Sequence, residues 1–353
     1  MSLVPAFRVR RPRRMHLLLA AVLAVSGAAA CSNTANSDRA GGVPTVIIGK
    51  AVDTIGFSAV DVASAEGYFK DAGVKVETKL LSGSSQTNAA LQGGSIQFGT
   101  LSSTALLLAA SQGVKLQAIT SLDYGVSVQF VVSKSWEQAH NINPTQPLKQ
   151  RMQGLQGAKD AAISSTGVQF LKLLLTQQGV DPNSLKYVTV GSDAAGAEAL
   201  GHGTLQIFVG SPPSTYFIAR QADADVLASA SEVQNWREMA YDLLVTTPDY
   251  ATKNPKTSTA VATALARAEN LMKTNPQAVL DLEAKHFPSY SRDDLLKSLQ
   301  VVQWTPNGLF TQAMWDDALA VTKQTGQLKQ DVDVSENSVW SNKYIDTSKL
   351  ASS

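Results

Sequence analysis

The chain has 353 residues, with 30 lysines and arginines against 29 aspartates and glutamates, and a net charge of +1. Beyond the first thirty residues, the chain is mildly acidic and has no basic patch that would attract nucleic acid. The length suits two domains, and the single cysteine, Cys31, excludes an internal disulfide.

The first thirty residues have the order of a bacterial export signal. Five arginines precede an apolar stretch from Leu17 to Val25, and small residues then lead to Cys31. The apolar stretch is shorter than the about 20 residues of a transmembrane helix. We therefore expect residues 1–30 to be removed after export by the general or the twin-arginine route. The remaining chain has 25 basic and 29 acidic residues, a net charge of −4.

The segment around the cysteine indicates a membrane anchor. Ala28-Ala29-Ala30-Cys31 resembles the lipobox of bacterial lipoproteins, which implies that Cys31 is lipidated and becomes the new N-terminus. Each buried methylene of an acyl chain contributes roughly 0.8 kcal/mol, so two or more chains anchor a domain durably. Residues 31–43, rich in Ser, Asn, Asp and Gly, are then a flexible tether. The alternative is a buried, unpaired thiol.

From residue 43 onward, strand patterns alternate with helical patterns. In the first region, short apolar or alternating runs predict strands at 45–51, 74–81, 96–101 and 115–122. Apolar residues at helical spacing predict helices at 58–73, 84–94 and 102–113. This alternation predicts a parallel sheet with crossover helices.

A second region repeats the alternation. It predicts strands at 160–165, 185–191 and 205–210, and helices at 166–179 and 193–203. Two extended segments, 127–134 and 241–247, bracket this region. After Tyr250 the pattern is wholly helical, with helices predicted at 256–274, 276–286, 291–301 and 311–325.

These patterns predict an α/β fold with two lobes. Because the helical tail has no sheet of its own to cover, we expect it to pack on the first lobe. The chain would then cross between the lobes twice, with a ligand cleft between them. Lobe 1 is predicted at 44–126 plus 246–345, lobe 2 at 127–245, and a short tail at 346–353.

Residues 57–122 resemble a known family. The segment "ASAEGYFKDAGV" (63–74), the glycine-serine turn at 82–85, and "FGTLSSTA" (98–105) are similar to periplasmic substrate-binding proteins of ABC importers. The resemblance is to the sulfonate, nitrate, taurine and thiamine-precursor family, and weaker similarity continues through 200–213 and the helical tail. It implies the two-lobed type II periplasmic binding-protein fold.

Hydroxyl and glycine residues recur at the turns that follow predicted strands. In open α/β sheets, ligands lie beyond the carboxyl ends of strands, where helix N-termini favour negative charge. Helix capping alone would explain many of these serines and threonines. The resemblance implies ligand contacts at the same turns, and the candidates are Ser84, Ser85, Ser102, Ser103, Ser165, Thr166 and Gly167.

Further candidates lie in loops between strands and helices. The loop 52–57 follows the first strand, where the family contacts its ligand, and supplies Thr54 and Phe57. Asp123 and Tyr124 end the fourth strand. Asp123 is either a partner for an amine, as in an amino-sulfonate, or a turn residue. Ser211 follows a strand of the second lobe, with Tyr216 nearby.

Enzymatic motifs are absent from the sequence. The four histidines, His16, His140, His202 and His286, lack zinc-site spacing, and neither a GxSxG nucleophile elbow nor a phosphate loop occurs. We expect no catalysis, no cofactor and no metal.

The resemblance implies a monomeric extracytoplasmic binding protein that delivers a small oxyanion, an aliphatic sulfonate above others, to an ABC permease with a separate ATPase subunit. Alternatives are a pyrimidine vitamin precursor, nitrate or an aromatic acid as ligand, a thiamine-precursor-synthesising enzyme, or an adhesive lipoprotein.

Overall fold

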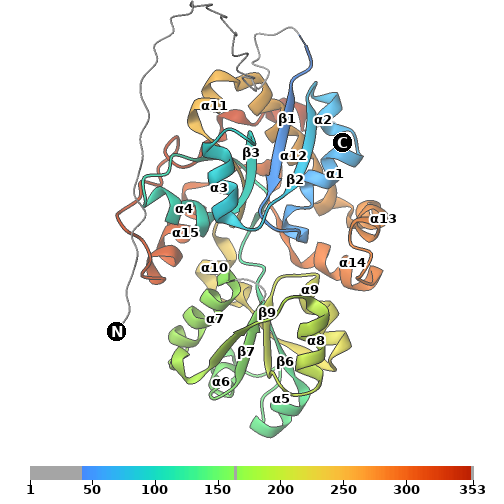
Figure 1. Ribbon diagram of the computed structural model, residues 1–353, viewed down its shortest axis with the longest axis vertical. Helices are drawn as coiled ribbons and strands as arrows, with labels where there is room; N and C mark the ends of the chain where they lie inside the picture. The colour runs from blue at the N-terminus through green and yellow to red at the C-terminus, as the bar shows by residue number, and fades with distance from the viewer. Residues whose placement is uncertain (1–41, 163–164, 351–353) are drawn as a thin grey trace, which may run out of the picture. The chain divides into compact units, whose positions relative to one another are not determined.

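A computed structural model describes residues 42–162 and 165–350 (Figure 1). The predicted signal peptide, Cys31 and nearly all of the predicted tether lie outside the described residues, as does the end of the predicted tail. Within the described part, no helix combines the length and the apolar character needed to cross a lipid bilayer.

Two five-stranded sheets organise the described chain. The first has the order β2-β1-β3-β11-β4 and the second β10-β6-β9-β7-β8. The strands of the first sheet are β1 (Thr45–Lys50), β2 (Lys75–Leu80), β3 (Phe98–Ser102), β4 (Gln117–Ser121) and β11 (Asp242–Thr246). Those of the second are β6 (Gln129–Ser133), β7 (Lys159–Ala162), β8 (Lys186–Thr189), β9 (Ile207–Gly210) and β10 (Ala224–Ser229). A two-stranded sheet pairs β5 (Asp123–Tyr124) with β12 (Gln303–Trp304).

Helices flank each sheet, so that each forms one α/β lobe. The helices of the first lobe are α1 (Ala59–Ala65), α2 (Tyr68–Asp71), α3 (Ser84–Gln92), α4 (Ser103–Ala110), α11 (Pro248–Lys253), α12 (Pro255–Thr274), α13 (Pro276–His286), α14 (Arg292–Val301) and α15 (Gln312–Gln324). Those of the second are α5 (Lys134–His140), α6 (Leu148–Gln153), α7 (Ser165–Gln177), α8 (Asp193–Gly201), α9 (Ser214–Gln221) and α10 (Gln234–Glu238). Short 3-10 turns are η1 (Ile55–Phe57), η2 (Pro182–Ser184), η3 (Ala230–Glu232), η4 (Pro306–Gly308), η5 (Asn342–Tyr344) and η6 (Thr347–Lys349).

The predicted two-lobed α/β fold is confirmed, with corrections to its elements. The sheets are mixed rather than parallel, because β11 is antiparallel to β3 and β4, and β6 is antiparallel to β9 and β10. The helix predicted at 58–73 is divided into α1 and α2, since Gly67 between them has a left-handed φ of 75°. The tail is not wholly helical, because β12 forms a short strand.

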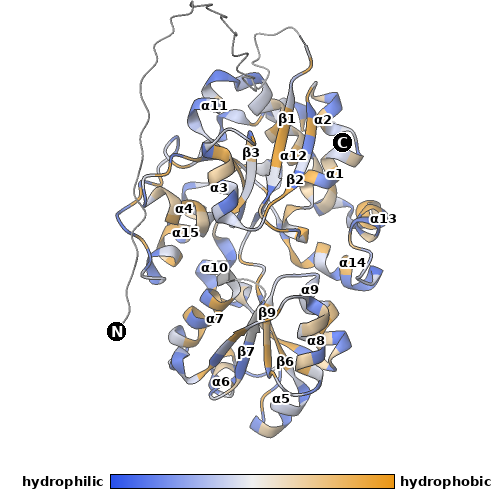
Figure 2. Cartoon of the chain, viewed as in Figure 1, coloured by the Kyte–Doolittle hydropathy of each residue, from blue (hydrophilic) through white to orange (hydrophobic). Residues whose placement is uncertain are grey.

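The helical tail packs on the first lobe, as predicted. Val261 and Leu265 of α12 are fully buried in one cluster with Ile48 of β1 and Phe98 of β3. Burying a side chain of this kind contributes about 1.5–3 kcal/mol relative to exposing it. Figure 2 shows the matching pattern, with strands such as β1 and β9 mainly hydrophobic and hydrophilic residues on the surrounding helices. The tail therefore completes the core of the first lobe.

Candidate functional site

The first sheet gathers its strand ends at the edge where the chain passes between the lobes. Asp242, the first residue of β11, pairs with Ser102 at the end of β3, and Leu243 pairs with Ser121 at the end of β4. Since β1, β2 and β3 are parallel, their carboxyl ends lie at this same edge.

The second sheet has the corresponding arrangement. Gln129, the first residue of β6, pairs with Gly210 at the end of β9 and with Ser229 at the end of β10. The chain crosses from the first lobe into the second just before β6. It crosses back after β10 and returns to the first sheet at β11. The carboxyl edges of both sheets therefore adjoin the two crossings, which is where an open α/β sheet presents ligand-binding loops.

The loop after β1 brings one predicted contact to this edge and buries another. Thr54 is half-buried, and its side chain does not cap η1. Phe57 is only 3% exposed and belongs to the core of the first lobe. Ligand contact by either residue stays a prediction, and Phe57 has a packing role in this structure.

The serines at the N-termini of α3 and α4 differ in their surroundings. Ser84 and Ser85 open α3, half-buried and exposed respectively. The hydroxyl of Ser102 accepts a hydrogen bond from the Ala105 N–H and so caps α4. Ser103 is fully buried, and its hydroxyl donates to the Ala240 carbonyl at 2.6 Å. Of these four predicted serines, Ser84 and Ser85 are therefore the two with hydroxyls open to a solute.

The two crossings are joined by a pair of buried aspartates. Asp123 is fully buried, and its Oδ1 accepts the Asp242 backbone N–H at 2.9 Å. Burial, and then the neighbouring Asp242 charge, raise the pKa of Asp123 well above its usual range, and burial raises that of Asp242. Tyr124 is half-buried and pairs with Gln303. In this structure Asp123 ties one crossing to the other, and an amine contact stays a prediction.

In the second lobe the predicted contacts flank the start of α7 and the end of β9. Ser165 and Thr166 begin α7, although their side chains lie outside the described residues. Gly167 is buried, and an added Cβ there would lie 3.0 Å from Val209 Cγ1, so close packing of α7 on β9 explains the glycine. Ser211 is half-buried just after β9, and Tyr216 Oη accepts a hydrogen bond from Gln129 Nε2 at 3.3 Å.

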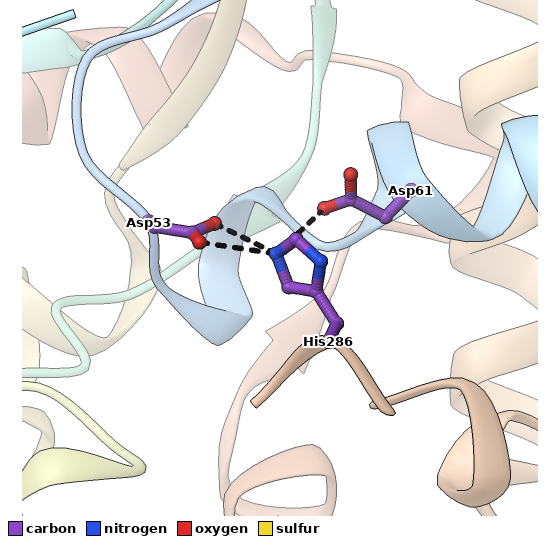
Figure 3. A group of neighbouring side chains, drawn as sticks. All are labelled: Asp53, Asp61 and His286. Atoms are coloured by element: carbon purple, nitrogen blue, oxygen red, sulfur yellow. Dashed lines mark hydrogen bonds and ion pairs between the residues drawn. The ribbon is translucent and has the colours of Figure 1, made fainter. Parts of the chain in front are cut away.

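A charged cluster at the end of β1 was missed by the sequence analysis. The Nζ atom of Lys50, the last residue of β1, lies 2.5 Å from Asp53 Oδ1 and 2.7 Å from Asp61 Oδ2. His286 Nε2 lies 3.0 Å from Asp53 Oδ1 (Figure 3). The loop after β1, helix α1 and the end of α13 each supply a side chain, so residues more than 200 positions apart meet here.

Two carboxylates and an imidazole are also the ligand types that hold a divalent metal. The cluster already contains a cation, because Lys50 Nζ contacts both carboxylates and lies 3.4 Å from His286 Nε2. Burial opposes both charges, but the ion pair with Asp61 and Asp53 keeps the Lys50 pKa raised, and His286 and Lys50 keep the Asp53 pKa lowered. The ion pairs of this cluster thus hold the loop after β1 against α1 and α13.

Solved structures of known proteins share this fold. The periplasmic aliphatic sulphonate binding protein SsuA from Escherichia coli matches with a TM-score of 0.64 at 17% identity, over 85% of this chain and 98% of that one. A zinc-bound ligand binding component of an ABC-type import system from Staphylococcus aureus gives 0.64 at 14%, over 81% and 94%. The nitrate-binding protein NrtA from Synechocystis PCC 6803 gives 0.57 at 14%, over 72% and 69%. The fold is therefore that of the two-lobed periplasmic binding proteins.

The sequence defines the family more closely. A family model described as NMT1/THI5 like matches residues 55–279, more than half of the chain, and the protein belongs to this family. No curated protein sequence matches the chain.

Proposed function

We propose that this protein is an extracytoplasmic solute-binding lipoprotein that captures a small oxyanion, an aliphatic sulfonate above others, and delivers it to an ABC permease with a separate ATPase subunit. It binds its solute between the lobes as a monomer and catalyses no reaction. The observation that carries this proposal is the convergence of both carboxyl edges on the crossings.

The helix ends at these edges favour an anion. Helices α3, α8 and α9 begin after strands at the carboxyl edges, and each presents unpaired backbone N–H groups in its first turn. The hydroxyls of Ser84 and Ser85 add donors beside α3. The negative charges of Asp53 and Asp61 are partly offset by Lys50, and the two side chains therefore repel an anion less than free carboxylates would.

Lobe boundaries and the anchor are part of the same proposal. The proposed division is 44–126 plus 246–345 for the first lobe and 127–245 for the second. Because β11 (Asp242–Thr246) is a strand of the first sheet, we place the return boundary a few residues earlier, before β11. A lipidated Cys31 would attach the protein to the outer face of the cell membrane through the tether 31–43.

The ligand is tested by thermal shift of the purified full chain with ethanesulfonate, nitrate, a pyrimidine vitamin precursor and benzoate. A solute at 100 times its dissociation constant should stabilise the folded protein by about 2.7 kcal/mol. We expect ethanesulfonate to raise the melting temperature most. If only the pyrimidine or benzoate raised the melting temperature, the proposed sulfonate ligand would be wrong. If only cationic compounds raised it, the proposed anion site would be refuted.

The site is tested with a double serine variant and a control serine variant. The double variant Ser84→Ala, Ser85→Ala removes hydroxyls at the first turn of α3, and it should weaken ethanesulfonate binding by about tenfold, the equivalent of 1.4 kcal/mol. Ser95→Ala removes an exposed hydroxyl just beyond the other end of α3 and should leave affinity unchanged. Equal affinities in all three proteins would contradict the assignment.

The anchor is tested by metabolic labelling with palmitate. The wild-type protein should incorporate label and sediment with membranes, whereas Cys31→Ala should do neither. Equal label in both proteins would disprove lipidation at Cys31.

A further inference from the structure

The turn between α13 and α14 connects the two lobes by side-chain contacts. Tyr290, in this turn, donates a hydrogen bond from its hydroxyl to Asp193 Oδ2 at 2.5 Å. Asp193 is the first residue of α8 in the second lobe. Ser214, the first residue of α9, has its hydroxyl 3.4 Å from the same Tyr290 oxygen. One tyrosine of the first lobe therefore contacts two helix N-termini of the second.

An ion pair lies beside this tyrosine. Arg220 of α9 donates from Nε and Nη2 to Asp294 Oδ2 of α14, at 3.2 and 2.8 Å. The Asp294 side chain is only 3% exposed, whereas that of Arg220 is 46% exposed. Phe217 packs edge-on against Tyr290, with ring centroids 5.5 Å apart. A carboxylate buried to this degree is stabilised in its ionised form by its charged partner, so removing Arg220 would leave the Asp294 charge uncompensated.

These contacts differ from the crossings in position and in kind. The crossings are covalent and pass from β5 to β6 and from α10 to β11. The contacts of Tyr290 and Asp294 are non-covalent and involve α8 and α9, whose N-termini belong to the proposed solute-binding edge. Two covalent strands alone allow the lobes to rotate about them, so side-chain contacts elsewhere restrict that rotation. A hydrogen bond from Gln177 of α7 to Gln324 of α15 also joins the lobes, but it lies on other helices than α8 and α9.

We propose that Tyr290 and Asp294, together with Asp193, Phe217 and Arg220, form a clasp that holds the second lobe against the first and slows solute exchange. His286, four residues before Tyr290, is bound to Asp53 in the loop after β1. The clasp is therefore connected to the same loop that the solute is proposed to contact. Its effect on solute exchange rests on the proposed function, whereas its effect on the lobes does not.

The first test measures the distance between the lobes in the full chain. Spin labels are placed at two exposed positions, Gln92→Cys and Lys186→Cys, in a Cys31→Ala background, and distances are measured by pulsed electron resonance. Asp294→Arg should broaden the distance distribution. The double reversal Asp294→Arg, Arg220→Asp should restore it, which a merely misfolded variant would not do. An unchanged distribution in Asp294→Arg, or no restoration in the double variant, would overturn the clasp.

The second test measures solute exchange with ethanesulfonate by stopped-flow fluorescence. Asp294→Arg and Tyr290→Phe should each raise the dissociation rate, the first by about tenfold, because breaking a buried charge pair mainly changes dissociation. Arg292→Asp breaks a neighbouring ion pair with Asp281 inside the first lobe, and it should leave both measurements unchanged. If wild type does not bind ethanesulfonate, the proposed ligand is wrong, and the distance measurement still decides whether the clasp exists.

Discussion

The pH dependence of stability should depend strongly on one buried carboxyl group, Glu283 of α13. Its side chain is fully buried, and its Oε2 accepts a hydrogen bond from the Ser58 hydroxyl at 2.9 Å. Burial raises the pKa of Glu283 from 4.5 to about 7, against the smaller opposing effect of that hydrogen bond. The folded protein therefore binds this proton more tightly than the unfolded chain does.

The sign and size of the effect follow from this difference. A raised pKa in the folded state contributes stability that is fully present below pH 4.5 and is lost as pH rises through about 7. At 1.36 kcal/mol per pH unit, the shift corresponds to roughly 3 kcal/mol, most of it lost between pH 5 and 8. Glu283→Gln keeps an oxygen for Ser58 and removes the titration, so it should flatten this part of the profile.

The assay is urea unfolding of wild type and Glu283→Gln at half-unit steps from pH 4.5 to 8.5. The variant should gain stability relative to wild type as pH rises, and the difference should level off above about pH 8. Glu198→Gln, at an exposed position of α8, serves as the matched control and should follow the wild-type profile. If Glu283→Gln retains the wild-type slope, Glu283 is not the group that titrates.

Three further predictions concern packing and charge. Gly56→Ala should lower the free energy of unfolding in urea by about 1–3 kcal/mol, because the added Cβ would overlap Asp242 Oδ2. Gly191→Ala is the control: its added Cβ would meet no atom within 4 Å, and it should be neutral in the same assay. Lys50→Met should cost about 3–5 kcal/mol at pH 7 by leaving two carboxylates without their cation. The cost should fall at acidic pH as Asp53, whose pKa is lowered by Lys50 and His286 in the wild type, protonates; a pH-independent cost in urea unfolding would contradict this. Trp315→Ala, at a fully buried side chain, should cost about 3–5 kcal/mol, and a calorimetric loss under 1 kcal/mol would refute its place in the core.

The sequence predicted the elements that have a clear period. The helices at 276–286 and 291–301 correspond to α13 and α14 within a residue, because apolar side chains recur there at helical spacing between proline or serine start signals. The two extended segments that bracket the second region were recognised as strands. Their separate sheets and antiparallel directions were not, since a strand's period of two carries no information about its partners.

The sequence placed candidate residues at turns, and their binding of a solute stays a prediction. Turns after strands were expected to bind solute, and the structure brings these turns to the edges beside the crossings. The cluster of Lys50, Asp53, Asp61 and His286 was missed, because Asp53 and His286 are 233 positions apart and neither forms a local motif. Ser103 resembled Ser84 and Ser85 in its sequence context. Only the three-dimensional structure shows that its hydroxyl donates a hydrogen bond to the Ala240 carbonyl.

The place of β11 also determines the order in which the lobes can be completed. Among the strands that the structure describes, β4 is joined to the rest of the first sheet only through β11, which is made after the whole second lobe. A nascent chain that ends before residue 242 can therefore assemble the continuous second lobe but leaves β3 and β4 without the strand between them. The first lobe must wait for the C-terminal third of the chain, so its folding is completed late, after most of the chain has been made.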